Sequence, residues 1–182
     1  MTTTMDLHRF LLRASGLAPD GLIVLARRWL ANNWTIGVAR TMVFSALIGH
    51  YRLTDEEAVA LAQVFADAGE EAAAIARLPR AAGGEPPDHE VVGRLDDRDA
   101  VDAVDQAAVH AVSIADGSEG VWRAWRIPRP DASFPEPKRI FLVQTAGDPV
   151  ALAAAVQRFL YAADEPHKHW REKSNAGGDR RR

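Results

Sequence analysis

The sequence predicts an α+β protein, with an N-terminal helical bundle followed by a small βαββα unit. Three observations predict it. Apolar side chains recur at helical spacing through the first part of the chain, a Pro/Gly-rich stretch interrupts it at 79–88, and residues 88–164 follow the pattern strand, helix, strand, strand, helix. This is the ferredoxin-like order lacking its last strand. A sheet without its last strand exposes backbone donors and acceptors, which another segment usually covers.

The composition is that of a globular protein and excludes several classes. The chain of 182 residues is 47% hydrophobic and 26% charged, with a net charge of −3 that favours neither nucleic acid nor an anionic membrane. The lack of cysteine rules out disulfides, thiolate zinc sites and cysteine nucleophiles. The start has no signal-peptide pattern, and the longest apolar stretch, 36–48, is too short to span a bilayer. We therefore expect a cytoplasmic protein.

The first part of the chain is predicted to form helices with two- to five-residue turns. The first is expected at 5–14 and the second from Asp20 to the break at Asn32–Asn33, and a short helix is expected near 72–78. The third helix, 34–50, is apolar nearly all round, which is typical of a helix that its neighbours enclose.

The fourth helix is predicted to begin at Thr54, which forms a capping box with Glu57. The third and fourth helices have the spacing of a helix-turn-helix, so a DNA-binding transcriptional regulator stays an alternative. The fourth helix, however, begins with Asp55, Glu56 and Glu57, whose carboxylates would face DNA phosphates. Nucleic acid is therefore not the expected partner.

The sequence predicts four regions along the chain. They are a helical bundle at 1–80, a Pro/Gly linker with a short strand at 81–95, a small α+β unit at 96–164, and a basic tail at 165–182. The tail has no alternating apolar pattern and is expected to be disordered.

Within the α+β unit, a helix is predicted from the helical spacing of Val101, Val104, Ala108 and Val112, and a strand is expected at 120–127. The next strand, 139–145, is apolar on both faces, which is typical of a central strand or one covered on both sides. Asp148 and Pro149 predict the start of a last helix, which ends near residue 163.

Charge is unevenly distributed along this second part. Residues 85–119 hold ten acidic and two basic side chains, and the following segment, 120–144, carries a net charge of +3. Internal pairing of the two segments is expected, because mixed charge is the normal state of a protein surface.

The strand at 120–127 supplies the candidate partner-binding residues, which are Trp122, Arg123, Trp125 and Arg126. Tryptophan and arginine dominate binding hot spots, and arginine stacks well on indole. The competing interpretation is that one tryptophan packs on the helices while the arginines pair with the acidic segment.

No motif specifies a reaction. The chain has no HExxH, GxSxG, GxxxxGK[ST] or GxGxxG pattern, and His8, His50, His89 and His110 are predicted to be surface or capping residues. His167 and His169 could hold a metal only weakly, because a metal site normally needs three or four ligands. We therefore predict no catalytic residue, no metal and no cofactor.

The sequence favours a non-enzymatic protein–protein interaction module, an adaptor or regulatory subunit that presents the Trp/Arg strand and an open sheet edge. The expected partner is another protein or a second copy of the chain, which would make a homodimer. A small-ligand-binding regulatory domain remains the other alternative.

Overall fold

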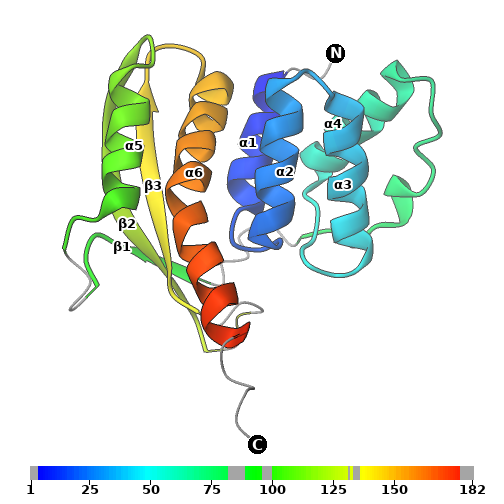
Figure 1. The fold of residues 1–182 in the computed structure, drawn as a ribbon. Helices are drawn as coiled ribbons and strands as arrows, with labels where there is room; N and C mark the ends of the chain where they lie inside the picture. Colours follow the sequence, from blue (N-terminus) through cyan, green and yellow to red (C-terminus); the bar gives the residue numbers. More distant parts are fainter. Residues whose placement is uncertain (1–3, 82–88, 96–99, 131, 133–135, 177–182) are drawn as a thin grey trace, which may run out of the picture. The chain divides into compact units, whose positions relative to one another are not determined.

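The computed structural model describes residues 4–81, 89–95, 100–130, 132 and 136–176, with side chains of the last helix described up to residue 163. Its elements are four N-terminal helices followed by strand, helix, strand, strand and helix (Figure 1). This order confirms the predicted fold class. The chain divides into two compact units, each built from two stretches: Met1–Gly93 with Ala124–Ile140, and Arg94–Arg123 with Phe141–Arg182. The predicted region boundaries stay a prediction.

The helical part contains α1 (Thr4–Ala14), α2 (Asp20–Ala31), α3 (Thr35–Leu47) and α4 (Asp55–Asp67), with a short 3-10 turn at Ile75–Arg77 in place of the short helix expected there. In sequence order each helix packs against the next. Their apolar faces form a core with Leu53 of the α3–α4 connection, and its largest fully buried side chains also include Leu7, Leu11, Leu30, Met42 and Leu61.

Local hydrogen bonds and backbone conformations set the start of α4 and the ends of α1 and α2 at the positions that the sequence predicted. The Glu57 amide donates to Thr54 Oγ1 at 3.2 Å and the Thr54 amide donates to Glu57 Oε2 at 2.9 Å, so the predicted capping box is present. Asn33, in the break after α2, has a φ of 56°, a left-handed conformation that asparagine tolerates. The turn after α1 passes through Gly16 at a φ of 101°.

The expectation that neighbours enclose α3 is wrong for one of its faces. Val38, Ala39, Met42 and Ala46 are buried, but Phe44, Leu47 and Ile48 at its C-terminal end are each more than half exposed. A helix in a bundle buries only the faces that meet other helices, and this bundle leaves the 44/47/48 side of α3 open.

The sheet consists of β1 (His89–Val92), β2 (Ser118–Pro128) and β3 (Lys138–Thr145), in the order β1-β2-β3. β1 pairs antiparallel with the end of β2, with His89 opposite Pro128 and Val92 opposite Trp125. β2 is thus the central strand. β3, which the sequence predicted to be central or covered on both sides, is an edge strand with Leu142 half exposed.

The second unit packs two helices on one face of its strands. α5 (Ala103–Ser113) and α6 (Pro149–Ala176) lie side by side (Figure 1). Their core consists of Ala111, Val112, Leu152 and Val156, against which Val121 of β2 and Val143 of β3 pack.

The start of α6 agrees with the sequence, whereas α5 begins at Ala103, after Val101, which the apolar spacing had placed in that helix. Asp102 and Asp105 form a capping box on α5, and Asp148 Oδ1 accepts from the Val150 amide at 2.8 Å at the start of α6.

The backbone of α6 continues beyond the predicted end near residue 163. It is helical as far as Ala176, which lies within the segment 165–182 expected to be disordered. For residues 177–182, which lie outside the described part of the chain, disorder stays a prediction.

Candidate interaction surfaces

Of the four predicted partner-binding residues, Trp122 is the exposed one. Its side chain lies 53% exposed, whereas Trp125 and Arg126 are buried at 7% and 8%. Successive residues of a strand point to opposite faces. Since Val121 packs on the helical core, Trp122 points to the opposite face of the sheet, away from α5 and α6. Whether this surface binds a partner stays a prediction.

The Trp122 indole packs against the backbone of β2 at Gly120. A Cβ built on Gly120 would lie only 2.7 Å from the outer edge of the indole ring, so the ring occupies the space that a side chain at position 120 would need. An aromatic side chain packed over a strand glycine covers backbone that would otherwise meet water. Trp122 is therefore both exposed and held against the strand.

Leu142 of β3 lies on the same face by the same argument. Val143 packs in the core with α5 and α6, so its neighbour Leu142 points outward, where it is 49% exposed. Trp122 and Leu142, on adjacent strands, make up what we call the sheet-face patch. Both are half-exposed apolar side chains on one face of the sheet.

Arg123 lies on the helical side of the strand. Its Nη1 donates to Asp105 Oδ2 at 2.7 Å and to the Ala100 carbonyl at 3.1 Å. Asp105 also belongs to the capping box of α5, so this ion pair connects β2 to the first turn of that helix. Pairing of a basic-segment side chain with an acidic-segment carboxylate is therefore present here, as the competing interpretation of the sequence expects.

Arg126 binds a carboxylate from the helical part of its own unit. Its Nη2 lies 3.1 Å from Asp20 Oδ1, and Lys138 Nζ binds the other carboxylate oxygen of Asp20. Burial by itself would raise the pKa of Asp20, but the hydrogen bond from Lys138 and the charge of Arg126 outweigh it and hold the pKa below its ordinary value. Asp20 is therefore a stable anion between two cations.

A third cation lies close to this carboxylate. Arg27, one turn further along α2 from the bundle core residue Ile23, donates from Nη2 to Ser15 Oγ at 2.9 Å. Burial lowers the pKa of Arg27, and the charge of Asp20 partly opposes that effect. The Arg27 Nε is buried and has no hydrogen-bond partner. Sequence reasoning missed this group, because Asp20 and Arg126 are 106 positions apart.

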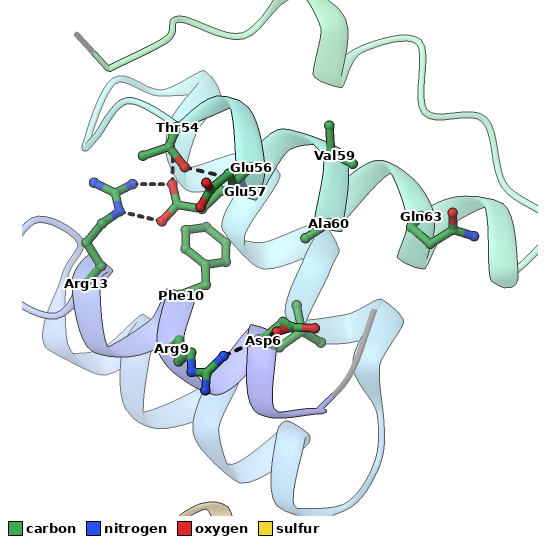
Figure 2. A pocket seen from close by; sticks show the side chains of 11 residues that line it. Asp6, Arg9, Phe10, Arg13, Thr54, Glu56, Glu57, Val59, Ala60 and Gln63 are labelled. Atoms are coloured by element: carbon green, nitrogen blue, oxygen red, sulfur yellow. Dashed lines mark hydrogen bonds and ion pairs between the residues drawn. The ribbon is translucent and has the colours of Figure 1, made fainter. Parts of the chain in front are cut away.

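A groove of about 600 Å³ runs between α1 and α4 (Figure 2). Buried Leu7 and Phe10 contribute to its wall. The Arg13 guanidinium forms a two-pronged ion pair with Glu57 at one end, and Arg9 lies 3.8 Å from Asp6. The two basic side chains of the groove, Arg9 and Arg13, are thus each paired with a carboxylate of the bundle.

The histidines that the structure describes do not gather into a metal-binding group. His8, predicted to be a surface or capping residue, is instead buried, because it lies on the face of α1 that also carries Leu7 and Leu11. His110 packs edge-to-face on Phe159 at 5.3 Å. Within the described ranges no group of three or more histidine, aspartate or glutamate side chains could hold a metal ion, and the side chains of His167 and His169 lie outside those ranges.

The fold and these surfaces define an α+β protein with a helical N-terminal part and an open, three-stranded antiparallel sheet. The sequence matches no protein-family model, and neither a curated protein nor a solved structure matches the chain. None of the helices in the described part of the chain is long and apolar enough to cross a membrane.

Proposed function

We propose that the protein is a non-enzymatic interaction module, an adaptor or regulatory subunit, which binds another protein through the sheet-face patch and the edge of β3. The observation that carries the proposal is the half-exposed Trp122, held over Gly120 on the sheet face opposite α5 and α6. A rigid, exposed tryptophan offers a large contact area with little loss of side-chain entropy on binding, and such residues dominate binding hot spots.

The edge of β3 supports the same proposal. Edge strands usually carry charges, prolines or bulges that discourage pairing with another chain. β3 has Lys138 and Arg139 at its start, but Ile140–Val143 is an uninterrupted apolar run. An extended segment of a partner protein that adds to this edge would gain backbone hydrogen bonds, and its side chains would reach Leu142 and Trp122 on the outer face.

Comparative affinity capture tests the proposal. Wild-type protein, Trp122→Ala and Trp34→Ala are immobilised in equal amounts and exposed to soluble extract of the source cells, which corresponds to the predicted cytoplasmic location. Trp34 is the matched control, because it is an exposed tryptophan (46%) at the start of α3. We expect a specific protein to be retained by the wild type and by Trp34→Ala, and to be lost with Trp122→Ala.

The captured protein is then purified and its dissociation constant measured by calorimetry. Loss of a hot-spot tryptophan is expected to weaken binding by at least about thirtyfold, which corresponds to about 2 kcal/mol. Equal affinity of the wild type and Trp122→Ala for every retained protein would show that the sheet-face patch is not the binding surface.

A second copy of the chain is an equally admissible partner under this proposal. Light scattering over a concentration series measures the mass of the wild type and of Trp122→Ala. A dimer that Trp122→Ala converts to a monomer would identify the partner as a second copy, in which the two open edges pair.

A further inference from the structure

The strongest unassigned feature is the carboxylate of Asp20, which two basic side chains bind and whose charge acts on a third. Arg126 and Lys138 both bind Asp20, and the charge of Asp20 also acts on Arg27. We call these four residues the cationic cluster. All four belong to the same unit of the chain. Among the described residues, Asp20 is the carboxylate in contact with the cluster, so the cluster has two positive charges in excess, within a chain whose net charge is −3.

Part of the excess positive charge is buried. Arg126 is 8% exposed, and the Arg27 Nε is buried without a hydrogen-bond partner. Buried charge is costly unless an opposite charge and hydrogen bonds compensate it. A single carboxylate, itself shared between Arg126 and Lys138, compensates the cluster only in part.

We infer that the cationic cluster binds a phosphate group, either free or carried by a small molecule. A phosphate carries about 1.5 to 2 negative charges near neutral pH, which matches the excess, whereas a carboxylate carries one. The guanidinium group of arginine suits phosphate because it can donate two parallel hydrogen bonds to phosphate oxygens. Arg126 uses only its Nη2 for Asp20 in the described contacts, which leaves its other guanidinium donors for a second anion.

Solvent reaches the cluster at Asp20 and Lys138. The side chains of Asp20 and Lys138 are 38% and 40% exposed, in contrast to 10% for Arg126. Gly21, the residue after Asp20, has no heavy atom within 4 Å of the place where a Cβ would stand. An anion would thus approach beside Asp20, contact Lys138 first and then reach the guanidinium of Arg126.

Titration with inorganic phosphate tests the inference on the full chain. Phosphorus NMR line broadening measures binding, with sodium acetate at equal ionic strength as the competing monoanion. We expect saturable binding of phosphate that acetate does not displace at equal concentration. Glycerol 3-phosphate is titrated in parallel, and the tighter of the two ligands tells whether the anion is free or part of a phosphate ester.

Three variants distinguish the cluster from general positive charge. Lys138→Gln is expected to weaken phosphate binding about tenfold or more, because it removes a charge-assisted hydrogen bond. Arg28→Gln is the matched control, since Arg28 is an exposed residue of α2 outside the cluster, and it should leave binding unchanged. Asp20→Asn should tighten binding, because it removes the competing carboxylate.

Circular dichroism of each variant shows whether it is folded before its affinity is compared. Absence of saturable phosphate binding to the wild type would overturn the inference. An equal loss with Lys138→Gln and Arg28→Gln would do the same, and so would weaker binding by a folded Asp20→Asn protein. None of these outcomes depends on Trp122, so the proposed interaction surface is tested separately.

Discussion

Gly16 is a position where a single methyl group should have a large local effect. Its φ of 101° lies in the left-handed region, and a Cβ there would stand 2.8 Å from Cε1 of the His89 ring and 3.2 Å from Cδ of Arg126. The turn after α1 thus approaches the β1–β2 pair of the same unit so closely that only glycine fits. Gly16→Ala is therefore expected to strain the backbone and also to displace the His89 ring.

The two contributions can be estimated separately. The left-handed backbone costs a residue with a Cβ about 1–2 kcal/mol, and forcing extra volume into a packed site costs about 1–3 kcal/mol. Gly16→Ala should therefore lower the free energy of unfolding by about 2–5 kcal/mol. Gly69 has a φ of 72° and belongs to the same unit, but no heavy atom lies within 4 Å of its Cβ position. Gly69→Ala should show only the backbone contribution.

Urea denaturation followed by circular dichroism measures both variants. A His89→Ala background adds the decisive comparison, because removal of the ring should bring the cost of Gly16→Ala close to that of Gly69→Ala. Equal destabilisation by Gly16→Ala and Gly69→Ala in the presence of His89 would refute the reasoning, since it would mean that the ring moves aside freely.

Three further predictions concern the same framework. Trp125→Ala should destabilise the protein by about 3–5 kcal/mol because it empties a buried site, whereas Trp122→Ala should cost less than about 1 kcal/mol; thermal denaturation of both variants checks this difference. Asp102→Ala should cost about 0.5–2 kcal/mol because it removes both hydrogen bonds that cap α5, and Gln106→Ala, at an exposed position of the same helix, is the control in urea denaturation. The pKa of Asp20 is lower in the folded protein than in the unfolded chain, so its contribution to stability is complete above about pH 4 and is lost as the pH falls through the folded value. Urea titrations at several acidic pH values should show that the free energy of unfolding falls less steeply with decreasing pH for Asp20→Asn than for the wild type. Identical slopes for the two proteins would contradict this prediction.

Features that depend on neighbours in sequence could be predicted. The capping box of Thr54 and Glu57 joins residues three positions apart, and the start of α6 needs only Asp148 and Pro149. The periodicity of apolar residues likewise predicted the order of the elements. Each of these signals lies within a few residues of the structure that it specifies, so a single sequence contains it.

Features that depend on distant residues could not be predicted in the same way. The sequence of Ile140–Val143 resembles a central strand, but strand order is set by which segments pair, and β2 became the central strand. Arg126 was a candidate for partner binding because arginine is frequent in interfaces. Its burial against Asp20 is a contact across 106 positions, for which a single sequence has no local signal.

The exposed side of α3 illustrates a third limit. An apolar surface all round a helix predicts burial only if enough neighbouring helices exist, and the sequence does not give their arrangement. Phe44, Leu47 and Ile48 remain open in the described part of the chain, although they are as apolar as the buried Met42.

The position of the Trp122 indole over Gly120 has a spectroscopic consequence. Protons held above the face or beside the edge of an aromatic ring experience its ring current, so the α-protons of Gly120 should resonate away from their usual frequency. Any molecule that draws the indole away from the strand would return these resonances toward the ordinary glycine range. Gly120 is thus a reporter, built into the backbone, of what happens on the outer face of the sheet.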